Sequence, residues 1–222
     1  MIYRVEKLLN WMTSERVSFY SRDSTPYGKT YGSWTVDWWS WFFSIPKSQN
    51  PVLDDTGEYS SVNQPSHHVW FLAGKYADED KRRFPTRSCT IPSNRSILFP
   101  VINCEANPLE YSELRSDEDI ITRVKRDEDS IVKMECLVDG ENIPAQRVKS
   151  DPLIFEIKVV PDNCVNIQGG GVTSASADGY WVFLKPLPVG EHNISFRGAC
   201  EYGKLNSGAD YRLLVTEDSF NQ

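Results

Sequence analysis

The sequence predicts a mainly β fold: an antiparallel β-sandwich, jelly-roll or immunoglobulin-like, with N-terminal helices and one further helix near residues 116–131. From residue 69 onward, short apolar runs rich in β-branched and aromatic residues alternate with turn signals. The connections between the later runs are too short to hold the crossover helices of a parallel sheet. A hydrophobic fraction of 40% and an aromatic fraction of 12% in 222 residues are enough for a packed core.

The chain is expected to form one structural unit with two parts. Residues 1–46 are predicted to be an N-terminal helical segment packed on the sheet, and residues 47–222 to be the β-sandwich domain. A first helix is expected over residues 3–13, where Val5, Leu8, Leu9 and Met12 recur at helical spacing.

Residues 33–46, SWTVDWWSWFFSIP, hold four of the seven tryptophans. At 100° per residue most of their apolar side chains cover a wide arc, which leaves one narrow polar stripe. Ser33 is the candidate N-cap, and Pro46 is expected to end the helix. A helix that is apolar on most of its surface is normally buried, so we expect it to seal the core. The alternative left open is that one or two of its rings line a pocket.

The strands are predicted in order along the chain. Residues 69–74 form the first, and residues 88–92 and 96–103 form a hairpin in which Pro100 indicates an edge, bulge or bend. The predicted helix 116–131 begins at a capping box of Ser116 and Asp119. Residues 132–143 read as a strand with an Asp-Gly turn, and residues 153–160 as another.

The last third of the chain predicts a closing meander. The segment 164–179 is rich in small residues and is expected to be flexible. Strands are predicted over residues 180–187, 191–203 and 209–217, joined by short turns.

Composition argues against several partners. The net charge of −7 disfavours a phosphate backbone. The densest basic group, Lys81–Arg83 with Arg87, stands beside three acidic residues and is interpreted as a solvated loop. No apolar run is long enough to span a membrane, and no signal peptide is recognised, so a cytoplasmic location is expected, with export left open.

The five cysteines are widely spaced and form no CxxC pair. This spacing disfavours a zinc ribbon. All five being reduced is the favoured interpretation, with one or two disulfides as the alternative.

No nucleophile elbow, zinc-protease motif, phosphate loop or dinucleotide fingerprint is present, which favours a protein that is not an enzyme. The candidate catalytic residues are carboxylates: Glu105, Asp54 and Asp55. Glu105 ends an apolar strand beside Asn103, where a pocket mouth is expected, and Glu110 is its candidate partner in a glycosidase dyad.

A weak calcium site is the candidate metal centre. Its potential ligands are Asp54, Asp55, Glu58 and His67, which share one loop with high oxygen density. Ordinary surface acids and loop histidines explain the same residues, so no cofactor is expected, with Ca²⁺ as the alternative.

Four stretches carry a resemblance: YGKTYGSWTVDWWSWFFSIPKSQNP, VWFLAG, CTIPSNRSILFPVIN and DGYWVFLKPLPVGEHNISFRG. Over about residues 27–215 the chain resembles an uncharacterised family of archaeal and environmental bacterial proteins. The resemblance implies a shared organisation, and no activity or catalytic residue comes with it.

Three functions remain open from the sequence. The first is a binding or structural module for a glycan, a surface polymer or a protein partner, with Trp39 and Tyr180 as candidate ligand-binding residues. The second is a carboxylate-based hydrolase acting on a glycan or ester, and the third is a module stabilised by Ca²⁺.

Overall fold

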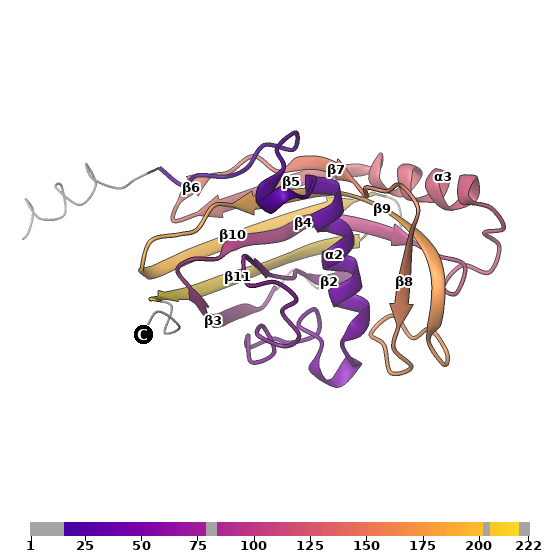
Figure 1. Cartoon of the computed structure of the whole chain (residues 1–222), viewed down its shortest axis with the longest axis horizontal. Coiled ribbons are helices and arrows are strands. Elements are labelled where there is room, and N and C mark those ends of the chain that lie inside the picture. The colour runs from indigo at the N-terminus through magenta and orange to yellow at the C-terminus, as the bar shows by residue number, and fades with distance from the viewer. Residues whose placement is uncertain (1–15, 79–83, 202–204, 218–222) are drawn as a thin grey trace, which may run out of the picture.

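The computed structural model describes residues 16–78, 84–201 and 205–217, and it confirms a mainly β sandwich with a few helices (Figure 1). The elements in chain order are η1 (Pro26–Gly28), α2 (Tyr31–Ser44), η2 (Lys47–Gln49), β1 (Val69–Phe71), β2 (Lys75–Asp78), β3 (Thr86–Pro92), β4 (Ser96–Ala106), α3 (Asp117–Glu128), β5 (Ile131–Val138), β6 (Glu141–Asn142), β7 (Gln146–Lys149), β8 (Phe155–Val159), β9 (Gly171–Leu184), β10 (Gly190–Cys200) and β11 (Leu205–Thr216).

The strands form two sheets. The first sheet has the order β1-β4-β9-β7, with β8 paired to the beginning of β9. The second sheet has the order β2-β11-β10-β5-β6, with β3 paired to β11. The β4–β9, β10–β11 and β5–β10 ladders are antiparallel, as expected, whereas β1–β4 and β3–β11 are parallel, so both sheets are mixed.

Two predicted strand connections are wrong. The strands β3 and β4 do not form a hairpin, because β3 pairs with β11 in the second sheet and β4 pairs with β9 in the first. The closing meander is limited to β10 and β11, because β9 belongs to the first sheet and not to the second. A short turn between two strands shows only that the chain reverses, and in a sandwich it can equally lead to the opposite sheet.

The prediction that residues 164–179 form a flexible segment is wrong for the second half of these residues. The strand β9 begins at Gly171, where it pairs with β8, and its buried alanines pack close to neighbouring elements. Small residues allow this close approach. In the sequence pattern alone, the same small residues indicated a loop. The bulge expected from Pro100 is confirmed, because the β4–β9 register shifts between Pro100 and Ile102.

The tryptophan-rich helix is present, with a different beginning from the one predicted. Thr30 is the N-cap, and its hydroxyl accepts a hydrogen bond from the Ser33 backbone N–H at 3.1 Å. Both residues are good N-caps, and Tyr31 and Gly32 already have helical geometry. The helix ends at Ser44, before Ile45 and Pro46, as expected.

The two faces of the first sheet belong to two cores. On one face Trp38 of α2 packs against Trp181 of β9, with ring centroids 5.4 Å apart. On the other face Phe99 of β4 packs against Phe196 of β10 at 4.9 Å. The molecule therefore has three layers, in which α2 runs across the strands of the first sheet (Figure 1).

The helix α3 covers one end of the first sheet, where it contacts β4 and β9. Its capping box is confirmed, because Ser116 accepts from the Asp119 backbone N–H and the Asp119 side chain accepts from the Ser116 backbone N–H. Ile120 and Val124 form its buried apolar stripe. This packing fixes the orientation of the polar residues in the last turn of α3, which matter for the site below.

The structure corrects the interpretation that Arg87 belongs to a solvated basic loop. Arg87 is 1% exposed, and its guanidinium donates to the carbonyl oxygens of Asp54, Val52 and Ala73 and to the Tyr211 hydroxyl. It is therefore a buried cross-link and does not belong to a solvated basic loop. The rest of that loop, residues 79–83, and the predicted helix 3–13 lie outside the described residues.

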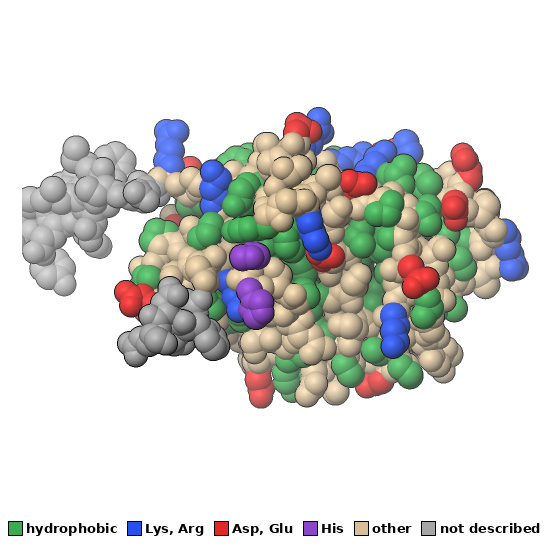
Figure 2. Space-filling view, viewed as in Figure 1, with side chains coloured by type: hydrophobic (Ala, Val, Ile, Leu, Met, Phe, Trp, Pro, Cys, Tyr) green, Lys and Arg blue, Asp and Glu red, His purple; other side chains and the backbone are tan. Residues whose placement is uncertain are grey.

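Acidic and basic side chains are scattered over the face in Figure 2 and form no patch of a single sign. None of the helices in the described part of the chain combines the length and the apolar character that crossing a bilayer requires.

Candidate functional site

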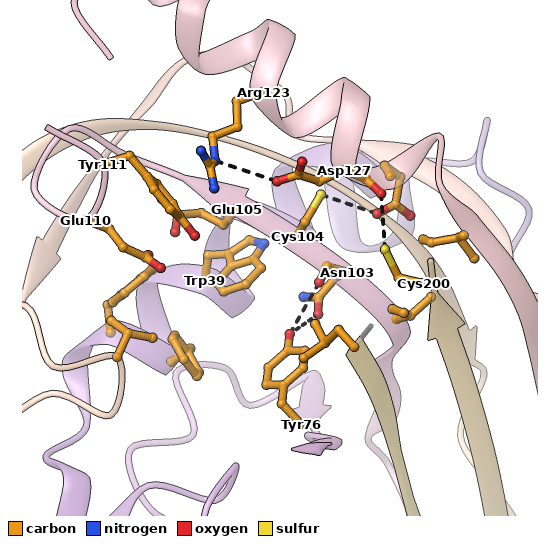
Figure 3. A pocket seen from close by; sticks show the side chains of 17 residues that line it. Trp39, Tyr76, Asn103, Cys104, Glu105, Glu110, Tyr111, Arg123, Asp127 and Cys200 are labelled. Carbon is orange, nitrogen blue, oxygen red and sulfur yellow. Dashed lines mark hydrogen bonds and ion pairs between the residues drawn. The ribbon is translucent and has the colours of Figure 1, made fainter. Parts of the chain in front are cut away.

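A pocket of about 310 Å³ lies beside the second half of β4. The strand β1 pairs only with Ser96–Leu98, so the described strands leave the rest of that edge of β4 without a ladder. Side chains from α2, α3 and the loop after β4 surround this space, which we call the edge pocket (Figure 3). Its lining includes Trp39, Phe42, Phe43, Tyr76, Asn103, Cys104, Glu105, Glu110, Tyr111, Arg123, Asp127, Glu128 and Cys200.

Trp39 differs from the other tryptophans of its helix. The indole N–H groups of Trp34, Trp38 and Trp41 donate to backbone carbonyl oxygens at 2.8, 2.9 and 2.9 Å. The Trp39 ring is only 4% exposed, and its N–H has no partner. A buried donor without an acceptor costs about 1–3 kcal/mol. Trp70 and Trp181 share this feature, and Trp39 is the one of the three that lines the edge pocket.

Asn103 contributes a second unsatisfied group. It lies on β4, is 3% exposed, and its Oδ1 accepts a hydrogen bond from the Tyr76 hydroxyl at 2.5 Å. The Nδ2 atom has no partner. If the amide were turned round, Oδ1 would be the orphaned atom, so one polar atom of Asn103 faces the pocket unpaired in either orientation.

Glu105 and Glu110 lie at the loop side of the pocket. Glu105 is half-buried, and both of its carboxylate oxygens accept from Asn107 Nδ2, at 3.1 and 3.3 Å. Burial raises its pKa well above the ordinary value, and the Asn107 hydrogen bond and the Glu110 charge act in opposite senses on it. Burial also raises the pKa of Glu110, the more accessible of the two carboxyls.

Glu128, at the end of α3, is the most buried carboxyl of the pocket at 2% exposed. Its Oε2 accepts a hydrogen bond from the Cys104 thiol at 3.3 Å, and its Oε1 has no partner. Burial, with the charge of Asp178 as the second cause, raises its pKa to about 8. Burial also raises the pKa of the Cys104 thiol, which makes it a poor nucleophile at neutral pH.

Arg123 is the pocket's cation, and it is held from several sides. Its guanidinium carbon lies 3.4 Å from the centroid of the Tyr111 ring. It also forms ion pairs with Glu113 at 3.3 Å and with Asp127 at 3.6 Å. Figure 3 shows the Trp39 indole, the Asn103 amide and the Arg123 guanidinium around one common space.

The structure brings some of the predicted site residues together. Glu105, Glu110 and Trp39 all line the edge pocket. Tyr180 does not join them: its neighbour Trp181 packs against α2, so alternation along β9 turns Tyr180 toward the other face of the first sheet.

Asp54 and Asp55 lie apart from the pocket, in their own loop. Asp54 accepts hydrogen bonds from the backbone N–H groups of Thr56, Gly57 and Tyr59, at 2.7 to 3.0 Å. These bonds belong to the structure of the loop, and they explain why Asp54 is buried and why its pKa is lowered. Asp55 pairs with Lys75 at 2.5 Å.

The loop also offers little to a metal ion. Both carboxylate oxygens of Asp54 are already engaged by backbone donors. Across residues 16–78, 84–201 and 205–217, no three side chains among His, Cys, Asp and Glu gather in a way that could hold a metal. Glu58 and His67 therefore complete no ligand set with Asp54 and Asp55 there.

Sequence reasoning missed Cys104, Arg123 and Glu128. One signal was available, because residues 123, 127 and 128 form a polar group at the end of a helix whose apolar stripe was recognised. Their approach to β4 depends on how α3 packs on the sheet, which the sequence pattern does not specify. The five cysteines form no disulfide with one another, in agreement with the favoured interpretation.

Comparison of the chain with protein-family models, curated proteins and solved structures finds no match. The resemblance to an archaeal and bacterial family therefore stays a prediction, and the chemistry of the edge pocket is the basis for a functional proposal.

Proposed function

We propose that the protein is a binding module whose edge pocket holds a small, hydroxyl-rich ligand of the sugar type. One observation carries the proposal: Trp39 Nε1, Asn103 Nδ2 and Glu128 Oε1 are unpartnered, come from three different elements, and line one pocket. Each of these side chains is more than nine-tenths buried. Arg123 Nε is a fourth atom of the lining without a hydrogen-bond partner. Buried polar groups are normally hydrogen-bonded, so several exceptions around one space favour a ligand that supplies the partners.

The hydroxyl group fits this set because it both donates and accepts. It can accept from the Trp39 indole and the Asn103 amide and can donate to a carboxylate oxygen. Aromatic side chains of Phe42 and Tyr76 supply the apolar surface that the ring of a sugar contacts. A volume of about 310 Å³ suits a small ligand and falls at the lower end of known ligand pockets.

The test is a comparison of two tryptophan variants in a calorimetric titration with monosaccharides and disaccharides. Trp39→Phe removes the pocket N–H and keeps an aromatic ring. Trp70→Phe is the matched control, because Trp70 is also buried with an unpartnered indole N–H and does not line the pocket. We expect Trp39→Phe to weaken binding by about tenfold, which corresponds to the loss of one hydrogen bond, and Trp70→Phe to leave it unchanged.

A carboxylate-based hydrolase is the second candidate, favoured by the raised pKa values of Glu105 and Glu110 in one pocket. In this case Glu105 would be the protonated acid and Glu110 the base or nucleophile. The measurement is release of nitrophenol from nitrophenyl glycosides and esters by the wild-type protein and by Glu105→Gln. Turnover that Glu105→Gln abolishes would support the enzyme, and binding without turnover would support the module.

A further inference from the structure

The charge balance of the edge pocket limits the chemical class of ligand that it can bind. Among the described residues of the lining, four carry carboxyl groups, Glu105, Glu110, Asp127 and Glu128, and one, Arg123, is basic. Arg123 is already committed to ion pairs at 3.3 and 3.6 Å and to an aromatic ring. Its charge lowers the pKa of Glu110, and the charge of Arg147, which lies outside the lining, lowers that of Glu128.

In each glutamate the effect of burial exceeds that of any cation nearby. Burial raises the pKa of Glu105, Glu110 and Glu128, and the charge of a neighbouring carboxylate adds to the shift of Glu105 and of Glu128. An opposite charge within about 4–6 Å favours the ionised form of a carboxyl group. A positively charged ligand group would thus bind to the carboxylates. Its charge would also lower their pKa values, so that they would release protons.

The walls of the pocket also suit an organic cation. Trp39, Phe42, Phe43, Tyr76 and Tyr111 present aromatic rings to it. An ammonium group over an aromatic face is attracted by the negative charge of that face, and more strongly where water is excluded.

A metal ion fits the pocket less well than an ammonium group. Trp39 Nε1 and Asn103 Nδ2 are donors, and a metal ion offers them no acceptor. In the part of the chain that the structure describes, no three potential metal ligands converge. The hydroxyl groups of a ligand would accept from both donors while its ammonium group meets Glu105 and Glu110.

We propose that the edge pocket is selective for a small aminated polyol, such as an amino sugar, whose ammonium group is bound by Glu105 and Glu110 while its hydroxyls meet Trp39 and Asn103. This inference rests on the proposed function and specifies the substrate class of the same site. The amine, rather than the sugar ring alone, then determines affinity.

Three probes separate the amine from the sugar ring: glucosamine, glucose and N-acetylglucosamine. Calorimetric titrations are made at about pH 6, where an amine is protonated. We expect glucosamine to bind at least tenfold more tightly than glucose, and N-acetylglucosamine, whose amine is neutralised, to lose that advantage. Titration in buffers of different ionisation enthalpy should show protons released on binding of glucosamine and none on binding of glucose.

Variants assign the effect to the pocket. Glu105→Gln keeps the shape of the side chain and should reduce the preference for glucosamine over glucose by about fivefold or more. Glu156→Gln, on the exposed side of β8, is the matched control and should leave the preference unchanged. Equal affinity of the wild-type protein for glucosamine and glucose would overturn the amine inference and leave the proposed function standing. If none of the three sugars binds, both fail, and tighter binding of Ca²⁺ than of glucosamine would also overturn the inference.

Discussion

The burial of Glu128 predicts a specific dependence of stability on pH. Its pKa is raised from 4.5 to about 8 in the folded protein because burial disfavours the charged form. In the unfolded chain this carboxyl ionises near its ordinary value. The folded state therefore holds the proton more tightly, so the contribution of this group is fully favourable below about pH 4.5 and is lost as the pH rises toward 8 and beyond.

The magnitude follows from the two pKa values. At 1.36 kcal/mol per pKa unit, the raised pKa of Glu128 implies that about 3 kcal/mol of stability is lost by pH 7 and about 5 kcal/mol by pH 9, relative to pH 4. Glu128→Gln keeps the shape of the side chain and removes its titration. We expect the variant to gain stability relative to the wild-type protein steadily as the pH rises from about 5 to 8.

The assay is urea unfolding followed by tryptophan fluorescence, at intervals of one pH unit from about 4 to 9. Because other groups titrate in both proteins, the informative quantity is the difference in the free energy of unfolding between Glu128→Gln and the wild-type protein. Glu156→Gln is the control at an exposed position and should show a nearly constant difference. A constant difference for Glu128→Gln as well would refute the reasoning, because it would mean that folding does not alter the proton affinity of Glu128.

Three further predictions concern the fold. Arg87→Lys should lower the free energy of unfolding by about 3 kcal/mol in urea titrations, because one ammonium group cannot replace a guanidinium that donates to four buried acceptors; an unchanged midpoint would contradict this role. Trp38→Ala should cost about 4 kcal/mol, since a fully buried ring between α2 and the first sheet leaves a cavity, and a loss below about 1 kcal/mol would be incompatible with that packing. All five thiols should react with a thiol reagent in denaturant without a reductant, and fewer than five would show that a disulfide has formed.

The fold class was predictable because it depends on local patterns. Alternating apolar residues mark strands wherever they pair, and the wide apolar arc of residues 33–46 required a buried helix whatever covered it. Which strands pair depends on contacts between distant segments. The turn between β3 and β4 therefore suggested a hairpin, although the two strands enter different sheets. For the same reason the beginning of β9, which is rich in small residues, was predicted to be a loop.

The candidate site was predictable in part, since Glu105, Glu110 and Trp39 were named from the sequence and all line the edge pocket. Glu105 and Asn103 attracted attention because polar residues at the end of an apolar strand often reach a pocket mouth, and both do line the edge pocket. Asp54 and Asp55 were also predicted to be site residues, only because acidic residues are dense in their loop. The structure shows that backbone donors of its own loop explain Asp54 and that an ion pair explains Asp55.

The unpartnered atoms could not have been predicted, because being unpartnered is a property of the whole arrangement. Three tryptophans of α2 donate to carbonyl oxygens, whereas Trp39 lines the pocket beside the stretch of β4 that β1 leaves uncovered. The same stretch allows Asn103 to keep an amide atom free, while the packing of α3 on β4 buries Glu128 beside the Cys104 thiol. A complete ladder along this edge would have filled the space and satisfied its backbone groups. The short β1 strand thus leaves this stretch of β4 without a paired strand among the described residues, and the edge pocket lies beside it.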